Sequence, residues 1–244
     1  MVTAKVSSDY LGVVSPQEIE QLQKSLKPGA RHALLALALD DSQHQVGANT
    51  ETAARAIFPN NEVWLRALKP RLLDNTDTAN ASNALGEIRA YGSLLETTMS
   101  VNPAPAVPSK KVQPEFEVNA GDGPAIVEVH SRQLDPTQAK ALQQFHLDQQ
   151  QKHQEAVAKD NATGKRQTIT TGAIGIIPFG APNPEKPGDS VLTNVISRVC
   201  GIKNSDKQVD SAKPFILWLD LQDPLVWGYL SISNGQLVPF ACNV

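Results

Sequence analysis

The chain has 244 residues, of which 41% are hydrophobic and 19% are charged. This length and composition allow a packed core and argue against wholesale disorder, so we expect one large domain or a compact domain with a smaller companion. The 22 basic and 25 acidic side chains give a net charge of −3. That balance does not indicate a nucleic-acid-binding protein, which needs clustered Lys and Arg, but it is compatible with a local basic groove.

The cysteines and the N-terminal segment indicate the cellular compartment in which the protein is expected. Cys200 and Cys242 are the only cysteines, which provides neither a disulfide framework nor a zinc pattern, so we expect two reduced, buried thiols. Residues 1–16 lack the charged start and long apolar stretch of a signal peptide. The longest apolar run, residues 33–39, is far too short to cross a bilayer. We therefore expect a soluble cytoplasmic protein with no membrane partner.

The first seventy residues have helical character. Ser15, followed by proline and then by Glu18, is typical of a capping box with proline at the first helical position. Neither His32 nor His44 belongs to a catalytic pattern, so both are expected to be structural or solvated. We assign residues 1–77 to a helical N-terminal cap or dimerisation region. The helices expected within it cover residues 16–26, 31–39 and 51–73, the last interrupted at residues 59–61.

The next segment changes from helical to strand periodicity. Residues 81–99 place apolar side chains at helical spacing, with Glu87 on the flank of the apolar face. Residues 102–108 contain three prolines and are expected to form a stiff extended connector. Residues 116–118 and 125–130 then alternate as strands do, and the glycine-rich stretch between them predicts a hairpin.

The remaining pattern completes an α/β arrangement. A helix is expected to begin at Asp135-Pro136 and to continue to about Lys159. After it we expect a strand over residues 168–177, a loop over 178–189, a helix over 190–201, a buried strand over 215–221 and a hairpin over 229–240. This order predicts an α/β sandwich around a mixed sheet, which we assign to residues 78–244.

Several polar and aromatic residues outside the main motif have ordinary explanations. His146 and His153 are seven residues apart on one helix, which does not suit a metal pair and indicates a solvated face. Asp220 is a single acid in an apolar strand and is expected to have a structural partner. Trp218 and Trp227 are expected in the core rather than as platforms for base stacking.

The expected hairpin carries the candidate catalytic and metal-binding residues. In a strand, alternate side chains share a face, so Ile126, Glu128 and His130 point one way. The hairpin brings Glu115, at the start of the preceding strand, beside Glu128. Two convergent carboxylates predict a site for Mg²⁺ or Mn²⁺, because hard cations prefer oxygen ligands.

This pattern resembles the PD-(D/E)XK, or restriction-endonuclease-like, nuclease superfamily. The family has a Pro-Asp pair on one strand, ten to twenty further residues, and then Asp/Glu-x-Lys on the next strand. Here Pro114-Glu115 is followed by twelve residues and then by Glu128-Val129-His130. Members commonly add an acid on the preceding helix, and Glu87 occupies that place. The resemblance covers roughly residues 80–240 in element order, and its motif consists of four or five residues.

The resemblance implies a function and a set of ligands. It implies metal-dependent hydrolysis of phosphodiester bonds in DNA, in a restriction or phage-defence role. Glu115, Glu128 and the carbonyl of Val129 would bind Mg²⁺ or Mn²⁺, with assistance from Glu87. The alternative for Glu115 and Glu128 is a pair of strand-edge carboxylates facing solvent, and the alternative for Glu87 is a helical glutamate that borders the core.

Two positions depart from the family pattern. Glu115 stands where Asp is usual, and its extra methylene shifts the metal. His130 stands where Lys is usual. With an unperturbed pKa of about 6.5, histidine could act as general base or join the metal ligands. It could equally mark a site that has lost turnover, or be a strand histidine with a structural partner.

The sequence leaves open which residues contact nucleic acid and whether the protein is an enzyme. Arg132 and Gln133, directly after the strand, and Lys203, after a later helix, are candidates for contacting phosphate, although surface turns and solvation explain them nearly as well. One alternative to a nuclease is a catalytically silent protein with the nuclease fold, which binds nucleic acid or a protein partner. A structural or assembly protein is another, and a homodimer or larger complex is compatible with all three.

Overall fold

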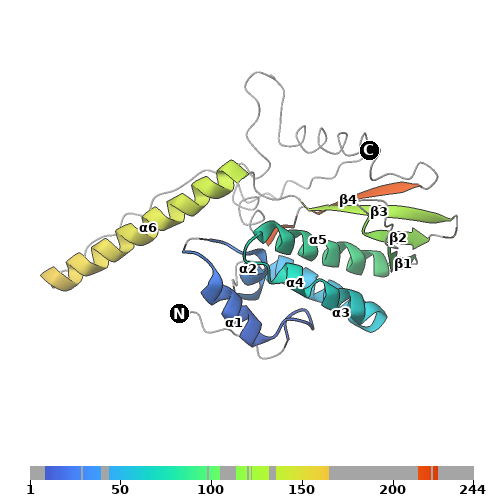
Figure 1. Ribbon diagram of the computed structural model, residues 1–244, viewed down its shortest axis with the longest axis horizontal. Helices are drawn as coiled ribbons and strands as arrows, with labels where there is room; N and C mark the ends of the chain where they lie inside the picture. The colour runs from blue at the N-terminus through green and yellow to red at the C-terminus, as the bar shows by residue number, and fades with distance from the viewer. Residues whose placement is uncertain are drawn as a thin grey trace, which may run out of the picture.

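The computed structural model describes ten segments of the chain: residues 9–28, 30–39, 44–97, 99–104, 114–119, 121, 123–131, 136–164, 214–220 and 222–224. Their elements, in chain order, are α1 Pro16–Ser25, α2 Ala33–Leu39, α3 His44–Ala67, α4 Lys69–Leu72, α5 Thr78–Leu95, β1 Ser100–Pro103, β2 Phe116–Asn119, β3 Pro124–Ser131, α6 Pro136–Thr163 and β4 Phe215–Asp220 (Figure 1). Among these helices, none combines the length and the apolar character that a bilayer crossing requires.

The four strands form one mixed sheet in the order β1-β2-β3-β4. The β1–β2 and β2–β3 pairs are antiparallel, whereas β4 runs parallel to β3. A parallel neighbour needs a crossover connection, and α6 lies on the chain between β3 and β4. The expected α/β class with a mixed sheet and flanking helices is therefore confirmed. In Figure 1, α5 lies along the sheet and α6 projects away from the body formed by the other elements.

The N-terminal helices follow the sequence signals with two adjustments. The capping box is present: the Glu18 N–H donates to Ser15 Oγ at 3.3 Å, and the Ser15 N–H donates to Glu18 Oε2 at 2.9 Å. Helix α3 begins at His44, seven residues before the start expected at residue 51. Its backbone leaves helical geometry at Asn61, shortly after Pro59, in the stretch where an interruption was predicted.

One strand was missed from the sequence. Residues 102–108 were expected to be a connector, but Ser100–Pro103 pair with β2 as strand β1, with Val101 opposite Val118. Four residues that end in proline have no strand signature of their own, and a proline is tolerated at the end of a strand. The segments expected at residues 168–177, 178–189, 190–201 and 229–240, and both cysteines, lie outside the described residues.

Helix α5 lies at the centre of the hydrophobic core, with the sheet on one side and α3 on the other. The core is continuous from the N-terminal helices through α5 to β1, β2 and β3. The rings of Trp64, Tyr91 and Phe116, from α3, α5 and β2, pack against one another there in edge-on and tilted arrangements, with centroids 4.9 to 5.5 Å apart. Residues 1–77 thus contribute helices to the core that α5 also lines, and the division at residue 77 stays a prediction.

Two glycines allow α5 to approach both neighbours closely. A Cβ on Gly86 would lie 1.9 Å from Ser131 Oγ on β3 and 2.8 Å from Asp220 Oδ2 on β4. A Cβ on Gly92 would lie 2.4 Å from the Cβ of Ala53 on α3. Both positions exclude any side chain unless neighbouring atoms move, so the two glycines set the spacing of the three layers.

A buried ion pair connects the same three layers. Arg89 of α5 donates to both carboxylate oxygens of Asp220, at 3.0 and 2.6 Å, and to Thr50 Oγ1 of α3 at 3.0 Å. The Arg89 and Asp220 side chains are 5% and 3% exposed. The expectation that Asp220 has a structural partner is confirmed. A pair this deeply buried is strongly destabilising when one member is lost, because the other charge is left uncompensated.

We predict that Gly86→Ala lowers the free energy of unfolding by about 1–3 kcal/mol or more, because the methyl group overlaps Ser131 Oγ. Gly47→Ala in α3 is the matched control. Its Cβ would lie 3.7 Å from the nearest atom, so the helical preference of alanine should raise stability by up to about 1 kcal/mol. Urea denaturation of the three proteins measures both values. Equal stability of the two variants would contradict the close approach.

Candidate functional site

The predicted hairpin places Glu115 where β2 separates from β3. The ladder between the strands reaches the pair Phe116–Val127, and the Glu115 N–H donates to the Val127 carbonyl at 3.1 Å. The Glu115 side chain then turns along β3, where its Oε2 accepts the Val129 N–H at 2.8 Å. A carboxylate therefore occupies the position at which the main chain of β2 would otherwise continue.

Glu128 lies beside Glu115, as expected from the register. Strand β3 alternates: Val127 and Val129 belong to the core beneath α5, which leaves Glu128 and His130 on the other face. Glu128 is nevertheless only 8% exposed, and its carboxyl group shares a hydrogen bond with that of Glu115. His130 is half-buried, two residues further along the strand.

The third acid, Glu87, approaches from α5. It is 7% exposed, and its charge raises the pKa of both Glu115 and Glu128. Glu87 therefore acts on the pair through its charge. Its part in a metal site, which the resemblance implies, stays a prediction, and the sequence alone located it on the flank of a helix.

A cation already accompanies this cluster. Arg71 of α4 donates from Nη1 to Glu87 Oε2 at 2.8 Å and from Nη2 to Glu87 Oε1 at 2.6 Å. The nearby charge of Glu115 also contributes to a raised pKa of Arg71. Sequence reasoning missed this residue, because it lies sixteen positions before Glu87 on a different helix and no periodicity connects the two.

The carboxyl pair is forced toward its neutral form. Burial is the largest cause and the charges of neighbouring acids add to it, so that the pKa of Glu115 rises to about 8 and that of Glu128 to about 7. The hydrogen bond from the Val129 N–H to Glu115 acts in the opposite direction. Carboxyl groups held together against this electrostatic cost are typical of sites that use them.

The donor set suits a hard divalent cation. Magnesium is usually held by one or two carboxylates together with water, and the Glu115–Glu128 pair with the Val129 carbonyl offers oxygen ligands alone. Within the described part of the chain, no three His, Cys, Asp or Glu side chains are arranged to hold an ion together. Both oxygens of Glu87 instead accept hydrogen bonds from Arg71.

The other candidates fall into two groups. Arg132, Gln133 and Lys203 lie outside the described residues, so their contacts with phosphate stay a prediction. His146 and His153 are exposed on α6, as expected.

Two further residues have the structural roles predicted for them. Trp218 packs against the core, in agreement with the prediction. His32 is buried, with its Nε2 3.1 Å from the Asp74 carbonyl oxygen, and its structural role is confirmed.

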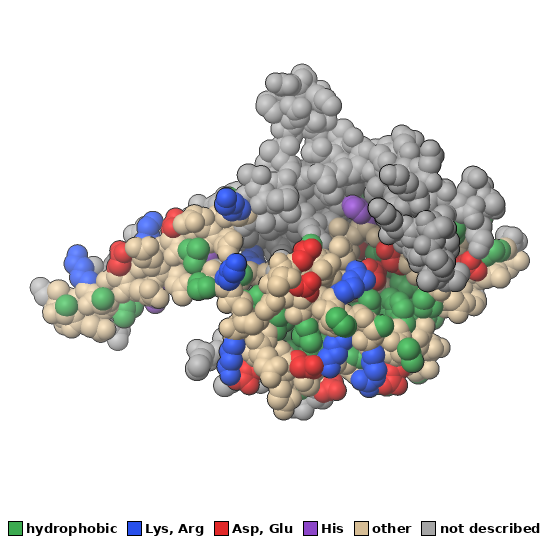
Figure 2. All heavy atoms as spheres, in the orientation of Figure 1, with side chains coloured by type: hydrophobic (Ala, Val, Ile, Leu, Met, Phe, Trp, Pro, Cys, Tyr) green, Lys and Arg blue, Asp and Glu red, His purple; other side chains and the backbone are tan. Residues whose placement is uncertain are grey.

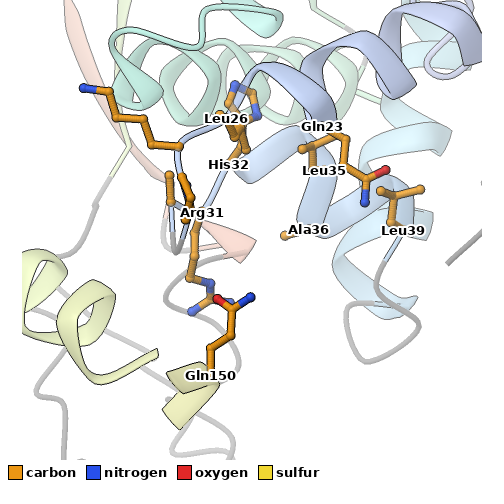
Figure 3. Close-up of a pocket in the computed structure, with 11 residues that line it drawn as sticks. Gln23, Leu26, Arg31, His32, Leu35, Ala36, Leu39 and Gln150 are labelled. Atoms are coloured by element: carbon orange, nitrogen blue, oxygen red, sulfur yellow. The ribbon is translucent and has the colours of Figure 1, made fainter. Parts of the chain in front are cut away.

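On the face seen in Figure 2, the described residues form no continuous basic band. The Lys and Arg side chains drawn there alternate with Asp and Glu over both the body and α6. An open hollow of about 650 Å³ lies elsewhere, between α1, α2 and α6 (Figure 3). Arg31, His32 and Gln150 contribute polar groups to it, and it shares no residue with the carboxyl cluster.

Comparison of the chain with family models, with curated proteins and with solved structures gave no match.

We predict that the metal-free protein loses stability as the pH rises from about 5 to about 8. In this window the folded protein retains protons on Glu115 and Glu128 that the unfolded chain has released, so the free energy of unfolding falls with pH. The melting temperature should fall by roughly 5 °C. Glu115→Gln should flatten this dependence and raise stability at pH 8, because an amide can still accept the Val129 N–H.

Thermal denaturation at pH 5, 6, 7 and 8 checks this prediction, with Glu117→Gln on the adjoining strand β2 as the matched control. The control should keep the dependence of the wild type. A melting temperature of the wild type that rises steadily up to pH 8 would rule out the neutral carboxyl pair.

Proposed function

We propose that the chain is a restriction-endonuclease-like, metal-dependent nuclease that hydrolyses phosphodiester bonds in DNA. The observation that carries the proposal is that Glu115 and Glu128 lie side by side where β2 separates from β3, with Glu87 of α5 near enough for its charge to raise the pKa of both. Three acids from separate elements are costly to bury together, and a bound divalent cation would remove that cost.

The order of elements supports the same assignment. Helix α5 carries the first acid, the second directly precedes β2, the third lies on β3, and α6 then leads to β4 beside β3. These are the places that the resemblance assigns to the acidic helix, the two motif strands and the helix that follows them. The strand β1, which the sequence did not reveal, completes an antiparallel meander before the parallel crossover.

The chemistry follows from the ligands and their neighbours. Glu115, Glu128 and the Val129 carbonyl would hold Mg²⁺ or Mn²⁺, and such an ion polarises a scissile phosphate and lowers the pKa of bound water. The hydrogen bond from the Val129 N–H holds the Glu115 carboxylate in place. His130, on the face of β3 that carries Glu128, would accept a proton from the attacking water in the place where the family has lysine.

A catalytically silent protein with the same fold is the second candidate. The substitution of His130 for the usual lysine favours it, as does the intermixed surface charge (Figure 2). Such a protein would bind nucleic acid or a protein partner without cleavage. A structural or assembly protein would show no salt-sensitive binding to DNA at all.

We predict cleavage of DNA that depends on Mg²⁺ or Mn²⁺ and stops when the ion is chelated. Glu128→Gln and Glu115→Gln should each lower the rate by at least about 100-fold, because each removes a charged ligand. Glu117→Gln, which changes an acid of β2 two residues after Glu115, should cleave like the wild type. His130→Lys should keep or raise activity, since it restores the family pattern.

The readout is the rate of cleavage of linear and supercoiled DNA, together with DNA binding at several salt concentrations. Binding without cleavage, in the wild type and in His130→Lys alike, would identify the silent fold. Cleavage that survives Glu128→Gln would show that the activity belongs to another site or to a contaminant.

A further inference from the structure

We propose that the contact between His32 and the turn that joins α4 to α5 is an acid-sensitive switch, which stays closed only while the imidazole is neutral. His32 directly precedes α2, and its partner Asp74 lies in the turn after α4. The inference concerns the N-terminal helices and is independent of the carboxyl pair and of the proposed nuclease function.

The turn between α4 and α5 receives contacts from several helices. His32 Nε2 lies 3.1 Å from the Asp74 carbonyl oxygen, and Asn75 Nδ2 donates to Ser25 Oγ, at the end of α1, at 2.9 Å. Asp77 follows as the N-cap of α5, and its side chain accepts a backbone N–H of the first helical turn. The imidazole therefore links the start of α2 to the segment that positions the start of α5.

The hydrogen bond determines which nitrogen of the neutral ring carries the proton. A carbonyl oxygen can only accept, so Nε2 of His32 holds the proton and Nδ1 keeps a lone pair. The residue is 2% exposed, and Nδ1 has no hydrogen-bond partner among the described residues. A second proton would create a buried cation with an N–H that lacks an acceptor, which is costly until water reaches it.

The charged groups around His32 do not remove this cost. Lys27 and Arg31 line the same hollow as His32 and are both cations, and Gln150, on the α6 side, carries no charge (Figure 3). Helix α2 itself contains no charged residue. Burial is the largest influence and lowers the pKa of His32, and the carbonyl and the charge of Asp74 oppose it only in part.

The consequence is a contact that weakens as the pH falls. From about pH 6.5 downward to the pKa of the buried ring, an opened chain binds a proton that the closed form does not bind, so acid favours opening. Opening would expose the first turn of α2 to water and release the turn before α5. This sign is opposite to that of the Glu115–Glu128 pair, so exchange at individual amides separates the two effects better than melting of the whole protein.

The test is hydrogen exchange of the full-length protein, followed by NMR at pH 5 and pH 7 and corrected for the intrinsic pH dependence of amide exchange. Amides of α2 and of the turn before α5 should exchange at least about threefold faster at pH 5, whereas amides in the middle of α5 should not accelerate. His32→Gln keeps a side-chain N–H donor but does not titrate, so it should lose this acceleration. His153→Gln, on the exposed surface of α6, is the matched control and should keep it.

An NMR titration of the His32 ring in the wild type gives a second measurement that does not depend on how the variants fold. Its midpoint should lie below the ordinary value of about 6.5. Acceleration at pH 5 that His32→Gln loses and His153→Gln keeps would support the switch. A ring midpoint at or above 6.5, exchange of α2 that does not respond to acid, or an acceleration that persists in His32→Gln would each overturn it.

Discussion

The close packing of α5 between the sheet and α3 is the constraint on which the structure depends. Gly86 and Gly92 remove side chains at the two points of nearest approach, and the Arg89–Asp220 pair connects the layers between them. Because α5 is held on both sides, Glu87 has a defined position relative to β3. The acidic site is therefore a consequence of core packing rather than of a loop.

The site forms where the regular pairing of β2 and β3 ends. Beyond the end of β2, Glu115 offers β3 a side-chain oxygen in place of a main-chain carbonyl, and this oxygen accepts the Val129 N–H. The same hydrogen bond directs the carboxyl group toward Glu128. Protons on Glu115 and Glu128 and the pairing of Arg71 with Glu87 each reduce the negative charge gathered here, and the proposed divalent cation would be a third way to do so.

A nuclease and a catalytically silent protein would differ in how the charge of these carboxyl groups is neutralised. An enzyme needs the cation to displace protons and to act on water, whereas a silent protein can keep the cluster neutralised by its own groups. His130 contributes to this choice, because an imidazole near neutral pH carries less positive charge than the lysine of the family pattern.

The sequence by itself determined the hairpin and the neighbouring positions of Glu115 and Glu128, because strand alternation and a glycine-rich turn are local signals. It also determined the capped helix that begins after Ser15. It did not reveal β1, whose four residues become a strand only through their partner β2. Nor could it bring Arg71 to Glu87, since contacts between different helices depend on how α4 and α5 pack. Tertiary structure alone decided that the acidic site contains its own cation.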